Sequence, residues 1–267
     1  VDLRLIYSKL AVSPETDRQQ FGMLQKYANP KRFLTLANSV LPWTTCATVI
    51  LIVAGLYFAF AASPPDYQQG QTVRIMYVHV PSAWMAMFAY AFIVVASAVG
   101  LIWKHPVAHV GALAAAPIGA CFTLICLATG SLWGKPMWGT WWVWDARLTS
   151  VLILFFLYLG FIALANAFDD SSRGEKASAI LALIGGINLP IIKFSVDWWN
   201  TLHQPASVSK IDMPSIHSSM LTPLLLMGIG FTALFVTLVI IRVRAELASR
   251  RINALRAAKI HAEVAGG

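Results

Sequence analysis

The sequence has 267 residues, of which 58% are hydrophobic and only 12% are charged, and its mean hydropathy is +0.66. A soluble domain carries about a quarter of its residues as charged side chains, so this composition excludes an ordinary soluble domain and indicates a membrane protein. The formal net charge of +8 would also suit a nucleic-acid-binding protein, but the basic residues follow the pattern of membrane topology instead, and we expect no nucleic acid as a partner.

Six apolar stretches follow one another along the chain, each about as long as the 20 residues that a helix needs to cross a bilayer. They lie at roughly 40–62, 82–103, 107–130, 148–168, 177–197 and 219–241. Transmembrane β-barrels show shorter, alternating segments, so we expect an all-α membrane protein with six transmembrane helices. We divide the chain into a polar segment 1–39, a membrane domain 40–241 with membrane lipid around it, and a basic tail 242–267.

Basic residues predict the orientation of these spans. If both termini face the cytoplasm, the first segment carries six Lys or Arg residues, the inner loops three and the C-terminal tail six, whereas the outer segments carry only five. An excess of Lys and Arg on the cytoplasmic side sets the topology of membrane proteins. We therefore expect both termini in the cytoplasm of a bacterium and the protein in the inner membrane.

The outer segments hold the chemically informative residues. The first, near 63–81, ends in Arg74 and the string YVHVP, in which Pro81 suits a helix start and places His79 just before the second span. The second outer segment covers 131–147. The third begins with WWNTLHQP and contains His203.

Tryptophan is concentrated on the expected outer side. Seven of the ten tryptophans fall there, whereas the inner side has little beyond Trp43 and Trp103. An interfacial belt occurs on both faces, so a belt explains part of this cluster but not its density. Five indoles within twelve residues, interrupted by glycine and proline, indicate a flat, rigid platform for a large planar molecule, with a porphyrin as first candidate and a quinone or lipid as alternatives. The candidate platform within 131–149 consists of Trp133, Trp138, Gly139, Trp141, Trp142 and Trp144.

Residues 138–149 read WGTWWVWDARLT, which resembles the WGxxWxWDxRLT signature of the haem-handling, or WWD-domain, membrane proteins. Within that family the chain resembles the CcmC branch, the haem exporters of bacterial cytochrome c maturation. The resemblance covers about residues 40–205 and includes the strings YVHVPSAW and WWNTLHQP. The two tails are not diagnostic.

The resemblance implies that the bound group is haem b and that His79 and His203 are the axial ligands of its iron. Imidazole is a common axial ligand, and both residues are expected outside, near the depth of the tryptophans. His217 is a weaker candidate because it follows a polar stretch without a motif. We expect the other histidines to be ordinary residues of the inner side, namely His105, His109 and His261.

Haem also carries two propionates, which arginine can bind through its planar fork. The resemblance implies such contacts for Arg147 and Arg74, with snorkelling of Arg147 and a solvated charge at Arg74 as alternatives. Lys135 and Lys193 are weaker candidates. Asp145 is expected to shape the platform, by pairing with an outer cation such as Arg147 or by accepting an indole N–H, and not to act in acid–base catalysis.

The resemblance further implies delivery of haem to the periplasmic chaperone CcmE and assembly with the ABC-transporter subunits CcmA and CcmB and the small membrane protein CcmD. The sequence contains no G-x-x-x-x-G-K-[ST] phosphate loop, so we expect any ATP hydrolysis in a partner. The expected function is therefore haem transport at the periplasmic face, without an enzymatic activity of the chain itself.

Other functions have weaker support. A haem lyase that attaches haem to apocytochrome c would share the tryptophan signature, but its relatives resemble one another in having histidines within their helices, and no expected span here has one in its apolar interior. A b-type electron carrier fails on the same observation. A transporter of another substrate would place charges or broken helices in the membrane, for which Lys193 and a kink at Asn188–Pro190 are thin support.

Overall fold

The computed structural model describes residues 28–203 and 216–266. Within these ranges the chain is helical, with a single isolated bridge between Asp66 and Gly70 and no strand. Six of its helical segments are long and apolar enough to cross a membrane, which confirms the predicted fold class. Most of the predicted polar segment 1–39 lies outside the described residues, as do the charges of Lys210 and its neighbours.

The elements follow the chain in a simple order. Some spans consist of one helix, and three combine an α-helix with a shorter element. In chain order the elements are α3 (Pro30–Tyr57), the π-helical turn η1 (Phe58–Ala62), the 3₁₀ turn η2 (Gln71–Ile75), α4 (Met76–Trp103), α5 (Pro106–Trp138), α6 (Ala146–Ala165), α7 (Ser171–Gly185), α8 (Asn188–Trp198) and α9 (Ser218–Gly266).

Side chains in front of the helices mark where they begin. Asn29, Asp145 and Asp170 each accept a hydrogen bond from a backbone N–H two or three residues further on, before α3, α6 and α7. His105 does the same before α5. The first N–H groups of a helix have no partner within the helix, so these short polar side chains satisfy them where the chain enters the bundle.

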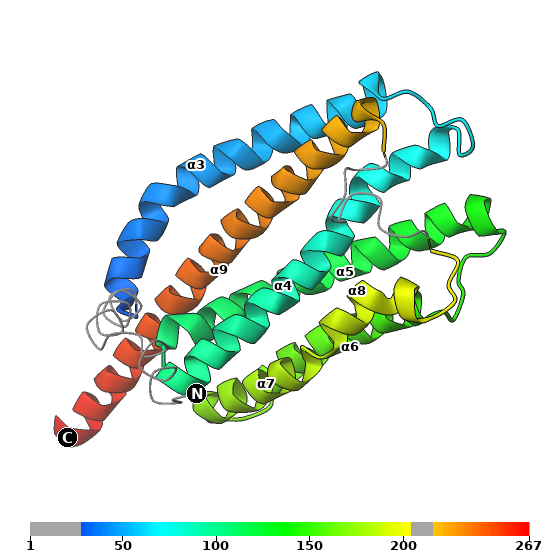
Figure 1. Ribbon diagram of the computed structural model, residues 1–267. Coiled ribbons are helices and arrows are strands. Elements are labelled where there is room, and N and C mark those ends of the chain that lie inside the picture. Colours follow the sequence, from blue (N-terminus) through cyan, green and yellow to red (C-terminus); the bar gives the residue numbers. More distant parts are fainter. Residues whose placement is uncertain (1–27, 204–215, 267) are drawn as a thin grey trace, which may run out of the picture.

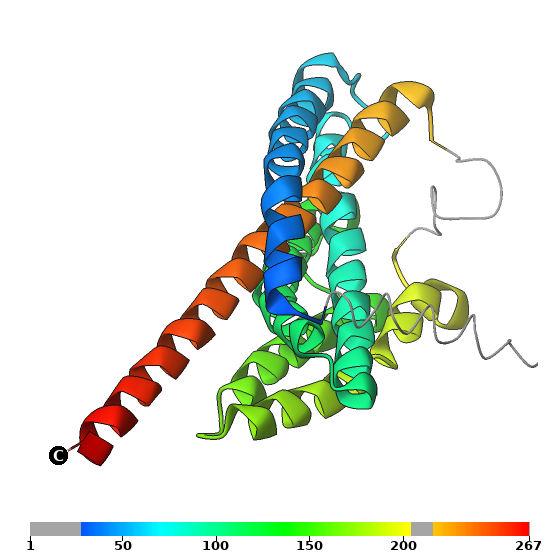
Figure 2. The ribbon, with the colours of Figure 1, turned by 90° about the vertical axis from the view of Figure 1, so that its left-hand side faces the viewer.

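The helices pack as a bundle with α4 and α5 at its centre. α4 contacts α5, α7 and α9, while α3 lies along α9 on one side and α6 packs against α5 and α7 on the other (Figure 1). In lipid, helices approach each other mainly through close packing of small residues. The buried residues of α4 and α5 are accordingly rich in alanine and glycine. In Figure 2 the C-terminal part of α9 extends away from the other helices.

The helices are longer than hydropathy predicts, and the difference changes how the candidate site is built. α4 begins at Met76, so His79 lies within its first turn and Pro81 lies inside the helix instead of at its start. η2 adds a turn of helix before Met76, and sequence signals for helix starts do not reveal such a turn.

The first part of the expected outer segment 131–149, up to Trp138, is also helical. α5 continues through Pro136 to Trp138 and ends where Gly139 adopts φ = +76° and donates its N–H to the Lys135 carbonyl. This left-handed conformation favours glycine. Gly139 therefore acts as a helix cap, and only residues 139–145 form the connection to α6.

The fifth span is broken. α7 ends at Gly185 and α8 begins at Asn188, whose side-chain amide donates to the Ser150 carbonyl oxygen at 2.9 Å. A Cβ at Gly185 would collide with the hydroxyl of Tyr90, a buried side chain of α4. The break lies near the kink expected at Asn188–Pro190 and makes α8 a separate short helix.

Gly119 provides a test of this packing. A Cβ at Gly119 would collide with the Tyr158 ring, whose hydroxyl donates to the Ala86 carbonyl at 2.7 Å. We expect Gly119→Ala to destabilise the bundle by about 1–3 kcal/mol through overpacking. Thermal unfolding in detergent measures the effect. Gly111→Ala is the control, since a Cβ there meets its nearest neighbour, Phe92, at 3.6 Å. Equal stability of both variants would contradict the packing.

Candidate haem-binding site

His79 packs against one face of α5. Its Nδ1 lies 3.1 Å from the Cys126 carbonyl oxygen and 3.1 Å from Thr129 Oγ1. The imidazole meets the Trp133 ring edge-on, with ring centres 5.7 Å apart and planes at 75°. A Cβ at Gly130 would lie 2.9 Å from His79 Cε1, so glycine at this position makes room for the imidazole against the helix.

These contacts define which nitrogen of His79 carries hydrogen. A carbonyl oxygen can only accept a hydrogen bond, so Nδ1 is the protonated nitrogen facing Cys126. The Thr129 hydroxyl donates to the Ile125 carbonyl at 2.6 Å, which leaves its oxygen to accept from Nδ1. In the neutral imidazole the lone pair therefore lies on Nε2, the nitrogen that can bind a metal.

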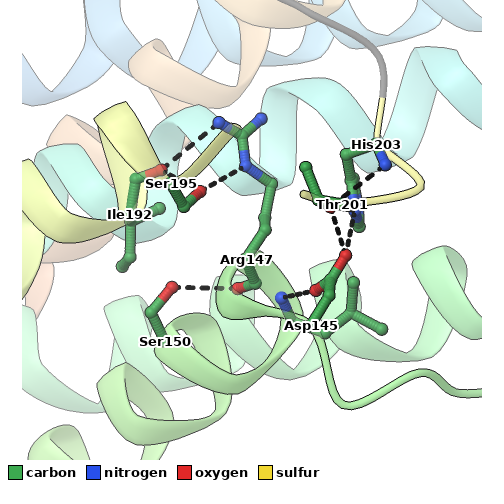
Figure 3. A network of polar contacts seen from close by, with 8 residues as sticks. Asp145, Arg147, Ser150, Ile192, Ser195, Thr201 and His203 are labelled. Carbon is green, nitrogen blue, oxygen red and sulfur yellow. Dashed lines mark hydrogen bonds and ion pairs between the residues drawn. The ribbon is translucent and has the colours of Figure 1, made fainter. Parts of the chain in front are cut away.

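His203 follows α8 and is held by Asp145, the acidic residue of the WGxxWxWD motif (Figure 3). His203 Nδ1 lies 3.2 Å from Asp145 Oδ2. The Thr201 hydroxyl donates to the same carboxylate oxygen and accepts the backbone N–H of His203 at 3.1 Å. The Trp138 ring lies against the imidazole, with ring centres 4.9 Å apart.

Burial and hydrogen bonds determine the charges of this pair. Burial raises the pKa of Asp145, but hydrogen bonds from Thr201, the backbone N–H of Leu148 and His203 outweigh it and hold this pKa below its usual value. Burial also lowers the pKa of His203, although Asp145 acts in the opposite direction. The carboxylate is therefore ionised and the imidazole neutral at pH 7, so Nδ1–H donates to Asp145 and Nε2 again has the lone pair.

The two histidines lie at the same end of the bundle. Each imidazole contacts a tryptophan of the last turns of α5. We call this end of the bundle the tryptophan end. The expected pair of imidazoles is thus gathered with Trp133 and Trp138.

Asp145 has other partners than the ones we expected. Within the described residues it neither forms an ion pair with Arg147 nor accepts an indole N–H. Its Oδ1 accepts the Leu148 N–H at 2.7 Å, and its Oδ2 accepts hydrogen bonds from Thr201 and His203. Asp145 is the cap of α6, and Arg147 lies two positions further. Positions two apart on a helix point to different sides.

Arg147 reaches from the start of α6 to the middle and last turns of α8 (Figure 3). Its Nε donates to Ser195 Oγ at 3.0 Å, and its Nη2 donates to the Ile192 and Lys193 carbonyl oxygens, both at 3.3 Å. These two carbonyls lie in the middle of α8, and that of Ile192 also accepts the Ser195 hydroxyl at 2.8 Å. Arg147 therefore fastens α8 to α6, and Nη1 is the part of its guanidinium that could meet a propionate.

The remaining tryptophans form an exposed surface with rings at steep angles to one another. Trp141 and Trp144 are 54% and 75% exposed, and the Trp142 and Trp144 rings meet at 76° with centres 5.5 Å apart. Edge-to-face contact is a preferred geometry of aromatic pairs. The expected platform is therefore apolar and aromatic but not flat.

Two buried donors at the tryptophan end lack a partner within the described residues. Arg74, in η2, donates from Nη2 to the Ser63 carbonyl at 3.3 Å, but its Nε has no acceptor. The Nε1 of Trp142 is also buried and has no acceptor among the described residues. Leaving a buried N–H without an acceptor costs about 1–3 kcal/mol. An anionic group bound at this end would satisfy such donors.

Several residues of the site escaped the sequence analysis. Thr201 belongs to the string WWNTLHQP, where a hydroxyl two residues before a histidine is a recognisable signal. Thr129 and Gly130 precede the tryptophan motif on the same face of α5 as Cys126. Cys126 contributes a backbone carbonyl, for which the sequence carries no signal. Gln69 accepts the Trp133 indole N–H at 2.9 Å and also has no motif.

The other described histidines have local roles. His217 is exposed, and its Nδ1 accepts the backbone N–H of Ser219 at the start of α9. His105 caps α5, and His109 packs against Gly100 of α4. The side chain of His261 lies outside the described residues.

The chain is similar to known proteins over most of its length. The family model described as heme exporter protein C matches residues 23–258. The chain is 60% identical to heme exporter protein C of Bradyrhizobium diazoefficiens, over 86% of this chain and 87% of the relative. It is 50% identical to heme exporter protein C of Haemophilus influenzae, over 84% and 91%, and 49% identical to that of Escherichia coli K12, over 83% and 89%. The chain therefore belongs to the heme exporter protein C family.

Proposed function

We propose that this protein holds haem b between His79 and His203 at the periplasmic face of the bacterial inner membrane and delivers it to the chaperone CcmE. The family to which it belongs handles haem in cytochrome c maturation, and the chain is a membrane-embedded, transport-type subunit.

The arrangement of the two imidazoles carries this proposal. In both histidines an acceptor engages Nδ1, which leaves the Nε2 lone pair for a metal. Within residues 28–203 and 216–266 no group of three or more His, Cys, Asp or Glu side chains could hold a bare metal ion. A pair of imidazoles suits iron whose other four ligands come from a porphyrin.

The surroundings of the pair suit the rest of a haem molecule. Trp133 and Trp138 contact the two imidazoles and offer apolar surface to a macrocycle. The unpaired donors of Arg74 and Trp142, together with Nη1 of Arg147, supply N–H groups for two propionates. Exposed Trp141 and Trp144 would shield one haem edge at the membrane boundary.

The topology supports the proposed location and partners. Both tails of the chain are basic relative to the tryptophan end, so by the positive-inside rule the site faces the periplasm and both termini face the cytoplasm. The absence of a phosphate-loop motif from the sequence makes an ATP-hydrolysing partner necessary if transfer consumes ATP. CcmA, CcmB and CcmD are the partners we propose.

Haem lyase activity has less support than haem transport. Among the described histidines, His79 and His109 are the two within membrane-spanning helices, and they lie in the first turns of α4 and α5. Neither is placed to ligate a second haem in the middle of the bundle.

The axial ligands are tested by single substitutions. We expect His79→Ala and His203→Ala each to lose the absorption bands of low-spin, bis-imidazole haem, since each removes one of two ligands. The spectra are recorded on protein purified with its haem. His217→Ala, which removes a cap of α9, should retain the parental spectrum. If both ligand variants also retained it, the proposed axial pair would be wrong.

The propionate contacts are tested with a modified haem. We expect the parent protein to bind haem b about tenfold more tightly than its dimethyl ester, because charge-assisted hydrogen bonds contribute about 1.5–3 kcal/mol. Arg74→Gln and Arg147→Gln should each reduce this preference, whereas Lys31→Gln at the other end of the molecule should keep it. Titration of apoprotein in detergent gives the affinities. A preference that is equal in all four proteins would exclude the contacts.

Delivery to CcmE is tested by copurification. We expect CcmE to copurify with the haem-loaded parent, and much less of it with a His79→Ala/His203→Ala double variant, because the complex forms around shared haem. Adding ATP to membranes that contain CcmA and CcmB tests whether hydrolysis releases CcmE. Equal recovery of CcmE with both proteins would show that haem does not hold the pair together.

A further inference from the structure

The two candidate ligands differ in the group that stands behind each imidazole. His79 Nδ1 faces a neutral backbone carbonyl and a neutral hydroxyl, those of Cys126 and Thr129. His203 Nδ1 faces the carboxylate of Asp145. This difference is a property of the chain itself, and its consequence for iron rests on the proposed function.

Asp145 is held so that one of its oxygens remains directed at His203. Oδ1 accepts the Leu148 N–H at 2.7 Å and thereby caps α6, and Oδ2 accepts from Thr201 and His203. The Asp145 side chain is only 6% exposed and the His203 side chain 20% exposed. Because water has little access to the pair, the carboxylate acts on the imidazole at low dielectric.

Thr201 completes the arrangement. Its hydroxyl donates to Asp145, and its oxygen accepts the backbone N–H of His203 at 3.1 Å. One hydroxyl therefore connects the carboxylate to the main chain of the ligand residue, and Figure 3 shows the three side chains converging. A second connection between the same elements, from Arg147 to Ser195 at 3.0 Å, is independent of Asp145.

A carboxylate that accepts a hydrogen bond from the non-ligating nitrogen increases the electron density on the ligating nitrogen and fixes the orientation of the ring. A neutral carbonyl has a weaker effect. We infer that Asp145, supported by Thr201, is a positioning residue that makes His203 the stronger axial donor and leaves His79 as the more readily exchanged ligand. Haem would thus be anchored on the α8 side and released first on the α4 side.

The clearest test is Asp145→Asn in the full-length, haem-loaded protein. Asparagine caps helices as well as aspartate does, so α6 keeps its cap while His203 loses the carboxylate. We expect ferric haem to bind about 10–100-fold more weakly, as for other residues that support a metal ligand. Loss of a donor that favours ferric iron should also raise the midpoint potential, by about 59 mV for each tenfold loss of ferric relative to ferrous affinity.

Asp170→Asn is the matched control. Asp170 caps α7 in the same manner, accepting the Ser172 N–H at 2.9 Å and the Ser172 hydroxyl at 3.0 Å, and no histidine contacts it in the described chain. Its substitution should leave the haem affinity and the midpoint potential at the parental values.

Substitutions of the residues that support each histidine test whether His203 is the stronger axial donor. Thr201→Val should raise the potential in the same direction as Asp145→Asn, and Thr201→Ser, which restores the hydroxyl, should return it to the parental value. Thr129→Val removes a neutral partner of His79 while the Cys126 carbonyl remains, and should shift the potential less than Thr201→Val does.

Potentiometric titration followed by absorption spectroscopy separates this inference from the proposed function. If the parent shows no bis-imidazole spectrum, the proposed ligands are wrong. If the parent shows that spectrum but Asp145→Asn and Asp170→Asn have the same potential and ferric affinity, the axial pair stands and the positioning role of Asp145 is overturned. A larger shift from Thr129→Val than from Thr201→Val would overturn the asymmetry.

Discussion

Two charged side chains at the start of α6 hold the middle and last turns of α8 and the residues after that helix, and the candidate site depends on them. Asp145 binds Thr201 and His203, and Arg147 binds Ser195 and the Ile192 and Lys193 carbonyls of α8. Since polar groups in or near lipid must find partners within the protein, the aspartate and arginine of one motif satisfy different groups of the same neighbouring segment. The WWD motif therefore connects α6 to α8 and the residues after it, in addition to providing an aromatic surface.

Hydropathy was sufficient to predict six spans because lipid imposes a length and a composition on each of them. The ends of the helices were harder to predict, because they depend on local geometry. The 3₁₀ turn η2 extends the helical segment in front of α4. At its other end, α5 continues past Pro136 until Gly139 ends it. These extensions moved His79 and Trp138 from expected loops onto helices, where their side chains have fixed directions.

The residues of the site could be predicted only where a motif carried them. His79, His203 and the tryptophans belong to such motifs, and their gathering at one end follows from the order of the spans. The partners of the histidines could not be predicted, since Thr201 lies 56 residues from Asp145 and Cys126 acts through its main chain. Composition records which groups are present, but hydrogen bonds between distant helices depend on how the helices pack.

The length of α9 gives the bundle a mechanical property. Its 49 residues correspond to about 74 Å of helix, more than twice the thickness of a hydrocarbon core of about 30 Å. One end begins near the tryptophan end, and the other extends past the remaining helices (Figure 1, Figure 2). Arg250 of α9 pairs with Glu175 of α7 at 2.8 Å, which ties α9 to the end of the bundle opposite the tryptophan end. Because 32 residues of α9 precede Arg250 and 16 follow it, a rotation of the helix about this ion pair would move its terminus at the tryptophan end about twice as far as its other terminus.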